Sequence, residues 1–312
     1  YILPSKVQLY ADKYDKKVKS GSGTFTQVDR EKSLQLLMRI NLLKRIESSI
    51  DSFRLTLNDI LSQIQNRLEL LKKENTESVS SVQWDIENEN VDWDADWGDE
   101  EKVRVEDLDK TRWIEDLEVD LDNLQTLSDE VSNISRSSDI KLKKLMEVVE
   151  EKFQNPINEN NRKVIIFTAF ADTANYLYNS LKDTLLENYN INTALITGSK
   201  RLCTSKNINT DLNTLLTCFS PISKNKKDIF PNLEDSIDVL IATDCISEGQ
   251  NLQDCDFLIN YDIHWNPVRI IQRFGRIDRI GSINSSITMV NFWPDVSLDA
   301  YINLKQRVED RM

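Results

Sequence analysis

The sequence has few of the residues that bind structural metals. It contains one histidine, His264, and four cysteines, none of which is spaced Cys-x-x-Cys from another. A structural zinc site takes four cysteine or histidine ligands at short spacings, so we expect no metal site and interpret the cysteines as buried, reduced thiols. We expect His264 to be a packed or hydrogen-bonded residue, since a lone histidine is seldom a base.

Long apolar runs are also absent. No stretch of the 312 residues approaches the length needed to cross a bilayer, and the first residues, Tyr1-Ile-Leu-Pro4, lack the build of a signal peptide. We therefore expect a cytoplasmic protein that does not contact a membrane. The start at Tyr1 suggests a piece cut from a longer protein.

Basic residues are scarce in one segment. Residues 75–130 hold 20 of the 52 acidic residues but 4 of the 39 basic ones, so the net charge of −13 belongs mainly to this segment. The rest of the chain can still present a basic surface to a phosphate backbone. The run over residues 84–101 should repel itself and stay extended.

The acidic run also contains three tryptophans, Trp84, Trp93 and Trp97. Aromatic residues in an acidic run could dock on a basic surface, either the protein's own nucleic-acid groove or a partner. A run that blocks the groove as a DNA mimic is a weaker alternative. The favoured interpretation is a solvated acidic tip.

Two stretches have the spacing of amphipathic helices. After a lead-in over residues 1–32, apolar residues recur every three or four positions from residue 33 to 71, with room for one break, and again over 114–131. Matching apolar seams joined by a long connection predict an antiparallel helical hairpin over 33–138, a stalk with an acidic insertion at about 75–110. The alternative is that each helix packs separately on the globular core.

Strands and helices alternate from residue 139 onward. A cap at Asp139 precedes a helix over 140–153. Short apolar strands are predicted at 164–167, 193–196, 238–242, 257–260 and 287–291, with helices at 173–188, at 212–219 and from Pro267. Short connections between them predict an α/β domain over 139–295, a parallel sheet covered by helices on both faces. A last helix is predicted over 296–312.

Polar residues follow the strand at 238–242. Thr243, Asp244 and the loop over 248–251 stand at its carboxyl end, where open α/β sheets bind ligands. Beyond Pro267, polar residues recur at helical spacing: Arg269, Gln272, Arg273, Arg276 and Arg279. This pattern predicts a helix with one apolar and one cationic face, and arginine at every cationic position favours bidentate phosphate binding. A solvated surface helix is the alternative.

Two stretches resemble motifs of the superfamily 2 helicases. Ala242-Thr-Asp with Glu248-Gly-Gln-Asn-Leu-Gln253 is similar to motif V, and Gln272-Arg-Phe-Gly-Arg-Ile-Asp-Arg279 is similar to motif VI. With Asn260-Tyr-Asp-Ile-His-Trp-Asn-Pro267 between them, the sequence resembles the Swi/Snf-related group in its bacterial RapA-like branch. The resemblance covers residues 139–281, a little under half of the chain, and implies the second RecA-like lobe.

The resemblance also implies roles for nine residues. Two match the arginine fingers that reach the γ-phosphate of ATP: Arg276 and Arg279. Four match positions beside the nucleotide: Asp244, Gly249, Gln272 and Arg273. Three match contacts with the DNA backbone: Thr168, Gly198 and Thr243.

The other half of such a motor is missing from the sequence. We find neither a phosphate loop that ends in Gly-Lys-Thr/Ser nor the magnesium-binding Asp-Glu pair. The resemblance implies the second lobe of an ATP-dependent DNA translocase or helicase, acting on double-stranded DNA with RNA as an open alternative. ATP and Mg²⁺ would be held mainly by a first lobe, and the chain alone would be inactive. The competing interpretation is a non-enzymatic module whose acidic stalk binds a protein partner.

Residues 199–236 depart from the family's pattern. The family usually has an arginine and a glutamine-rich helix here, whereas this stretch is rich in asparagine and lysine. We therefore assign it no site residue.

Overall fold

The computed structural model describes residues 18–20, 23–25, 27–73, 78–79, 103–104, 109–135, 138–246, 250–264 and 267–294. Within it the chain forms two compact units. The first comprises Tyr1–Arg45 and Phe53–Ile134, and the second comprises Ile46–Ser52 and Ser135–Met312. The predicted acidic run over 84–101, the predicted site residue Gly249 and the predicted helix over 296–312 lie outside the described residues.

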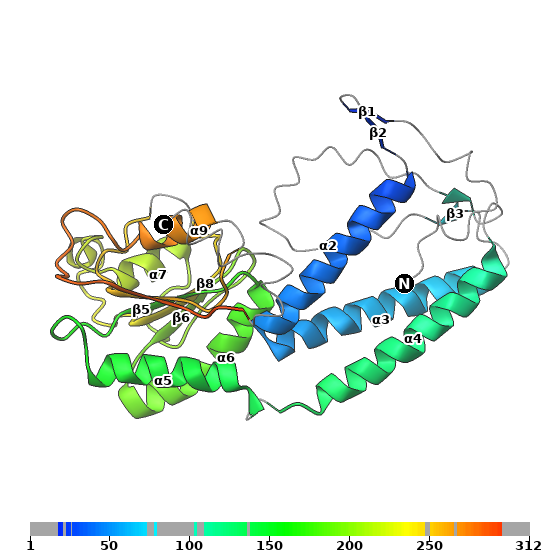
Figure 1. Cartoon of the computed structure of the whole chain (residues 1–312). Coiled ribbons are helices and arrows are strands. Elements are labelled where there is room, and N and C mark those ends of the chain that lie inside the picture. The colour runs from blue at the N-terminus through cyan, green and yellow to red at the C-terminus, as the bar shows by residue number, and fades with distance from the viewer. Residues whose placement is uncertain are drawn as a thin grey trace. The chain divides into compact units, whose positions relative to one another are not determined.

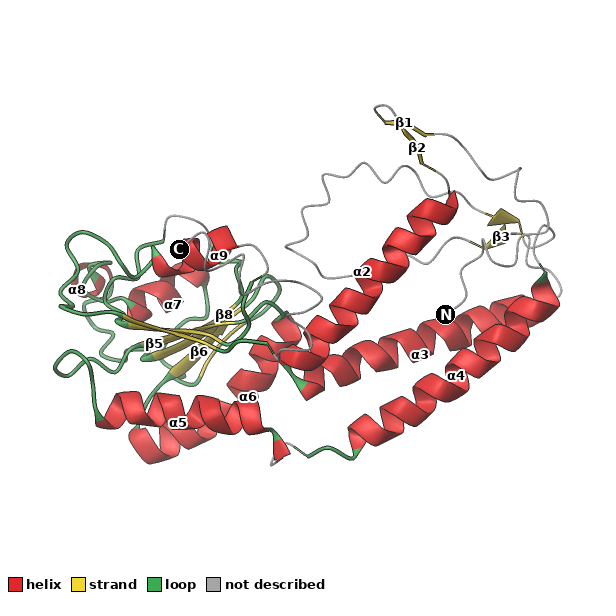
Figure 2. Cartoon of the chain, viewed as in Figure 1, coloured by secondary structure: helices red, strands yellow, loops and turns green. Residues whose placement is uncertain are grey.

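A six-stranded sheet forms the centre of the second unit (Figures 1 and 2). Its strands are β5 (Val164–Phe167), β6 (Thr193–Ile196), β7 (Arg201–Cys203), β8 (Val239–Ala242), β9 (Phe257–Asn260) and β10 (Thr288–Asn291). They lie in the order β10-β9-β5-β8-β6-β7. Phe167 is in register with both Ala242 and Asn260, so β5, β8 and β9 end at the same level.

The sheet is mixed, which corrects the prediction of an all-parallel sheet. Strand β7 runs antiparallel to β6 at the edge, whereas the other pairs are parallel. A tight turn causes this reversal: the Thr197 amide donates to the Lys200 carbonyl at 2.8 Å, and the Thr197 hydroxyl accepts from the Lys200 amide at 2.9 Å. Strands joined by so short a turn pair antiparallel.

Helices cover both faces of the sheet, as predicted. They are α5 (Ile140–Gln154), α6 (Ala171–Tyr189), α7 (Leu212–Phe219), the short α8 (Lys226–Ile229) and α9 (Pro267–Phe274). Figure 1 shows α5 and α6 on one face and α7 and α9 on the other. In β5, Val164 and Ile166 pack in the cluster with α5 and α6, while Ile165 and Phe167 pack in the cluster with α7. Alternate side chains of one strand therefore build two cores.

Asp139 caps helix α5, as the sequence predicts. Its carboxylate accepts the Leu142 amide at 2.8 Å and the Tyr176 hydroxyl of α6 at 2.7 Å. Helix α6 ends at Tyr189, and the next residue, Asn190, has a φ of 53°, the left-handed conformation common just after helix ends. The two helices on this face are thus joined by a polar contact as well as by the hydrophobic core.

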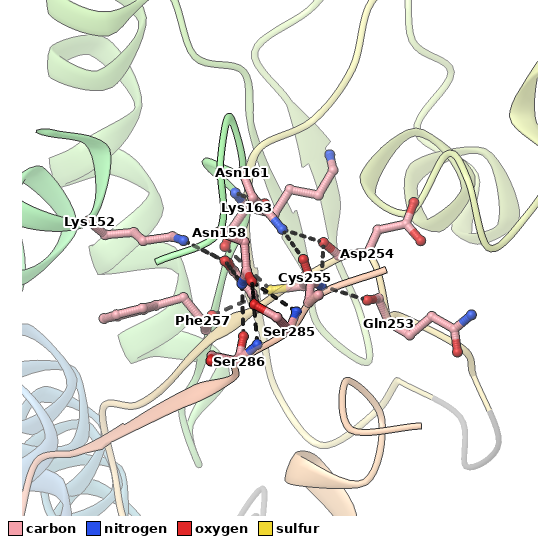
Figure 3. Close-up of polar contacts among 12 residues, drawn as sticks. Lys152, Asn158, Asn161, Lys163, Gln253, Asp254, Cys255, Phe257, Ser285 and Ser286 are labelled. Carbon is pink, nitrogen blue, oxygen red and sulfur yellow. Dashed lines mark hydrogen bonds and ion pairs between the residues drawn. The ribbon is translucent and has the colours of Figure 1, made fainter. Parts of the chain in front are cut away.

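A polar network closes the amino-terminal end of the sheet (Figure 3). Asp256, just before β9, forms an ion pair of 2.8 Å with Lys152 of α5, and both side chains are 0% exposed. The Asn158 amide donates to Asp256 at 2.8 Å, and its oxygen accepts the Ser285 amide at 2.9 Å. The network therefore joins α5, β9 and the segment before β10.

Among the described residues, the first unit contains α4 (Lys110–Ser132) and most of α2 (Gln27–Ser48) and α3 (Ile50–Lys72). The end of α2 and the start of α3 fall in the segment Ile46–Ser52 of the second unit. Buried Ile64, Leu71 and Trp113 belong to one hydrophobic cluster of α3 and α4. Near one end the Arg54 guanidinium donates to the Val131 carbonyl at 3.2 Å, and near the other Lys72 pairs with Glu118 at 2.7 Å. Helices α3 and α4 are therefore antiparallel, while a stalk with an acidic tip stays a prediction.

The start of α2 differs from the predicted boundary. The helix begins at Gln27, six residues before the apolar spacing starts, because glutamine, arginine, glutamate and lysine extend a helix without an apolar pattern. Two short antiparallel strand pairs are also found: β1 (Val18–Ser20) with β2 (Gly23–Phe25), and β3 (Ser78–Val79) with β4 (Val103–Arg104). None of the described helices is long and apolar enough to cross a membrane.

Candidate functional site

Arg273 and Asp244 form a buried bidentate ion pair. The Arg273 Nε and Nη2 atoms donate to the two Asp244 carboxylate oxygens, each at 2.6 Å. Arg273 Nη1 also donates to the Asn260 side-chain oxygen at 2.9 Å and to the Asp262 carbonyl at 3.1 Å. The guanidinium lies 5.1 Å from the centre of the Phe167 ring. One side chain of α9 thereby holds residues that follow or end β5, β8 and β9.

The ion pair fixes the charge of Asp244. Burial on its own would raise the pKa of this carboxyl, but the charge and hydrogen bonds of Arg273 outweigh burial, and His264 and Arg269 act in the same direction. The pKa of Asp244 is therefore held below its usual value, and the group is a carboxylate at neutral pH.

The predicted division into a cationic and an apolar face is wrong. Arg273 and Arg276 are 1% and 5% exposed, whereas Ile271 is 45% exposed and Ile280 is fully exposed. The physical reason is that the buried carboxylate of Asp244 takes Arg273 into the interior, where spacing alone places a surface cation. Ile270 and Ile277 are buried as predicted.

The arginine-bearing helix is also shorter than predicted. Helix α9 ends at Phe274, and the following amides of Arg276 and Ile277 bond three residues back, at 3.2 and 3.0 Å. Glycine at position 275 favours this ending because it is a poor helix former. The Arg276 carbonyl accepts the Leu252 amide at 3.0 Å, which joins this turn to the segment after β8.

Arg279 has a different environment from Arg276. Its side chain is exposed, and its Nε donates to the Gly275 carbonyl at 3.1 Å. Of the two predicted arginine fingers, Arg279 is thus the one that the structure presents to solvent, held against its own turn.

Gln272 is half-buried, and its side-chain oxygen is buried with no hydrogen-bond partner among the described residues. Buried polar atoms usually have a partner, so this oxygen can accept a hydrogen bond from a group outside the described chain. Gln272 therefore remains a candidate contact.

The predicted backbone contacts differ in accessibility. Gly198 is exposed in the turn after β6. Thr168 is fully buried and its hydroxyl donates to Asp262, so it cannot reach a phosphate in this arrangement. Thr243 is nearly buried, and its hydroxyl has no partner within the described part of the chain.

Asp262 forms a polar cluster that the sequence did not predict. Its carboxylate accepts the Ser48 hydroxyl at 2.8 Å and pairs with Lys141 at 3.1 Å, in addition to Thr168. The Ser48 hydroxyl also lies 2.6 Å from the Thr173 hydroxyl of α6. The backbone carbonyl of Asp262 also accepts a hydrogen bond from Arg273, so Asp262 links this cluster directly to the Arg273–Asp244 pair. The one sequence signal that could have indicated Asp262 was its position in the stretch Asn260–Pro267, which lies between the two helicase-like motifs.

Sequence reasoning also missed Lys224, which lies between α7 and α8. Its Nζ donates to the Gln250 side-chain oxygen at 2.7 Å, in the stretch that resembles motif V. The chain departs from the family's pattern in this region, so no motif could indicate the residue.

The segment that contains these residues matches a known protein family. The family model for the helicase conserved C-terminal domain matches residues 140–281, which contain all nine predicted site residues. The chain contains a helicase C-terminal domain. The resemblance to the C-terminal lobe of Swi/Snf-related superfamily 2 helicases is thereby confirmed, with relatives in the RapA-like branch.

Curated proteins with similar sequences match parts of this chain. The uncharacterized ATP-dependent helicase YqhH of Bacillus subtilis is 32% identical over 164 residues, 52% of this chain and 23% of that protein. The RNA polymerase-associated protein RapA of Serratia proteamaculans is 38% identical over 63 residues, 20% of this chain and 6% of that protein. This chain thus spans less than a quarter of either relative.

Among solved structures, the C-terminal part of the Fun30 ATPase domain is similar at 13% identity with a TM-score of 0.38. The alignment covers 91% of this chain and 85% of that one. A likeness of this size adds nothing to the assignment, which stands on the family model and the sequence relatives.

Proposed function

We propose that this chain is the second lobe of an ATP-dependent DNA translocase or helicase. In this role Arg279 reaches the γ-phosphate of ATP bound by a first lobe, while the helicase C-terminal domain contacts the nucleic-acid backbone. The observation that carries the proposal is the exposed Arg279 on a turn that the Leu252–Arg276 hydrogen bond and the buried Arg273–Asp244 pair hold in place.

The residues present fit the phosphates of ATP. ATP supplies a phosphoryl group whose transfer develops charge on its oxygens, and a fixed arginine that stabilises this charge is worth about 10³–10⁵ in rate. Arg279 is an exposed guanidinium of the kind that grips phosphate oxygens in pairs. Mg²⁺ would be held mainly by the first lobe.

The buried site residues have positioning roles in this proposal. Arg273 uses four hydrogen bonds within the chain, so it orders Asp244 and the turn instead of binding the nucleotide itself. Arg276 is nearly buried next to that turn and would contact the phosphates after a rearrangement on lobe closure. Gln272 and Gly249 are the remaining residues that we propose lie beside the nucleotide.

Double-stranded DNA is the proposed nucleic acid, and its phosphates would meet the carboxyl ends of the strands. Gly198 is the exposed member of this set, and a glycine lets backbone amides approach a phosphate closely. Thr243 offers a hydroxyl without a partner within the described residues, while Thr168 acts through Asp262.

The test is ATP hydrolysis, with and without double-stranded DNA or RNA, by a full-length protein that carries this chain. Arg279→Ala should lower the DNA-stimulated rate by about 10³-fold or more. Arg162→Ala is the matched control, because it removes an exposed arginine at the amino end of β5. The 312-residue chain alone should be inactive. A rate unchanged by Arg279→Ala would contradict the proposal.

The helices of the first unit belong to the proposal as an accessory element. We infer that residues 33–138 form a stalk with an acidic tip and that 139–295 form the motor lobe. A purely non-enzymatic module that binds a protein partner through the stalk is not favoured, because residues 140–281 match the helicase conserved C-terminal domain.

A further inference from the structure

Lys224 lies on a segment that is tied to the candidate site. The carboxylate of Asp254, in the connection from β8 to β9, accepts the amides of Ile222 and Ser223 at 2.6 and 2.9 Å. The Lys224 amide donates to the Ser220 carbonyl at 3.1 Å at the end of α7. The backbone before and at Lys224 is therefore fixed at both sides.

The side chain of Lys224 is also directed. Its Nζ donates to the Gln250 oxygen at 2.7 Å, three residues before Gln253. Gln253 in turn donates to the Gly281 carbonyl at 3.4 Å and accepts the Ser282 hydroxyl at 3.0 Å. Gly281 and Ser282, which follow Arg279 in the sequence, are thus joined to Gln253, in the same stretch as the Lys224 partner Gln250.

Lys224 and the turn that carries Arg279 are both bonded to the segment over residues 250–252: Lys224 donates to Gln250, and the Leu252 amide donates to the Arg276 carbonyl. Burial is the main cause that lowers the pKa of Lys224, and the charge of Arg279 lowers it further. Within the described residues neither cation forms an ion pair with a carboxylate. Two like charges held together in this way repel each other, and a polyanion that bound between them would relieve the repulsion.

A polar atom beside Lys224 also lacks a partner. The Ser223 hydroxyl oxygen is buried and has no hydrogen-bond partner in the described part of the chain. This hydroxyl can therefore donate a hydrogen bond to a ligand bound beside Lys224.

We propose that Lys224 binds the terminal phosphates of the nucleoside triphosphate together with Arg279. This inference rests on the proposed function and adds a second cation from a segment outside the helicase motifs. Lys224 supplies a point charge where Arg279 supplies a planar fork, so the two can contact different oxygens of the same phosphate group.

The test is equilibrium binding by the full-length protein, measured by calorimetric titration with a non-hydrolysable ATP analogue and, separately, with ADP. Lys224→Ala should weaken binding of the analogue about tenfold, the size of one charge-assisted hydrogen bond, and change the Kd for ADP less than about twofold. Lys224→Arg should restore most of the affinity. Lys227→Ala, an equal charge change at an exposed position of α8, is the matched control and should bind like wild type.

Each other outcome is informative. If Lys224→Ala binds the analogue like wild type while Arg279→Ala still abolishes hydrolysis, Lys224 is not a ligand and the proposed function stands. Equal weakening of analogue and ADP, or an equal loss with Lys227→Ala, also overturns the assignment to the terminal phosphates. If Arg279→Ala has no effect on hydrolysis, the proposed function itself fails.

Discussion

Arg273 and Asp244 lie 29 positions apart in the sequence and meet in a pair of 2.6 Å hydrogen bonds with almost no exposed surface. The pair joins α9 to the end of β8. It therefore sets the distance between the two stretches that resemble motifs V and VI, whatever else binds there.

The first prediction concerns this pair. Asp244→Ala leaves the guanidinium of Arg273 buried without its counter-charge, so we expect the free energy of unfolding to fall by about 3–5 kcal/mol. Urea denaturation of the chain measures it. The double variant Asp244→Leu with Arg273→Met should lose less than the sum of the losses of Asp244→Leu and Arg273→Met measured singly, since it leaves no lone charge. Strictly additive losses would show that the pair is not coupled.

The second prediction concerns the fully buried ion pair at the amino-terminal end of the sheet. Lys152→Met leaves the Asp256 carboxylate with Asn158 and no cation partner, and should cost about 3–5 kcal/mol in urea denaturation. Lys144→Met is the control, because its pair with Glu147 is 2.9 Å long but well exposed, and we expect a loss under about 1 kcal/mol. Similar losses for both lysines would contradict the role of burial.

The third prediction concerns the first unit. Trp113 is fully buried against α3, and the Arg67 guanidinium lies 5.8 Å from its ring centre. Trp113→Ala should destabilise this unit by about 3–5 kcal/mol through lost burial and a cavity. Val119→Ala on the exposed side of α4 is the control and should change stability by less than about 0.5 kcal/mol. Hydrogen exchange of α3 amides reports on this unit separately, and unchanged protection in Trp113→Ala would refute the prediction.

The fourth prediction concerns pH. Burial raises the pKa of the Cys255 thiol from 9.0 to about 12. Above about pH 9 the unfolded chain loses this proton while the folded chain keeps it, so stability falls as pH rises toward 12, by up to about 1.4 kcal/mol per pH unit. Cys255→Ala removes this contribution. We expect its stability, measured by urea denaturation from pH 8 to 11, to fall less steeply than that of wild type. Parallel curves would show that Cys255 does not titrate in this way.

Much of the fold could be predicted because its strands are short apolar runs. In β5 all four residues are buried on two faces, which produces a continuous hydrophobic run that periodicity reveals. The cap at Asp139 could be predicted for a similar reason, because its partner amide is three residues away. Local signals were sufficient wherever the interacting groups are near in sequence.

The rest depends on partners far apart in the sequence. Spacing placed Arg273 on a cationic, phosphate-binding face, because nothing in the helix itself shows that Arg273 pairs with Asp244. The same limit applies to Asp262, whose partners Ser48 and Lys141 come from distant segments. Lys224 was missed because the residues just before it are held by the carboxylate of Asp254, 30 positions after Lys224 in the sequence.

Because β5, β8 and β9 end in register, insertions and deletions within these strands should be poorly tolerated. One residue advances a strand by about 3.3 Å, which exceeds the whole range of hydrogen-bond lengths. A one-residue insertion or deletion inside any of these strands would therefore move Thr168, Asp244 or Asp262 out of reach of its side-chain partners. Changes in chain length between related proteins are therefore not expected inside these three strands.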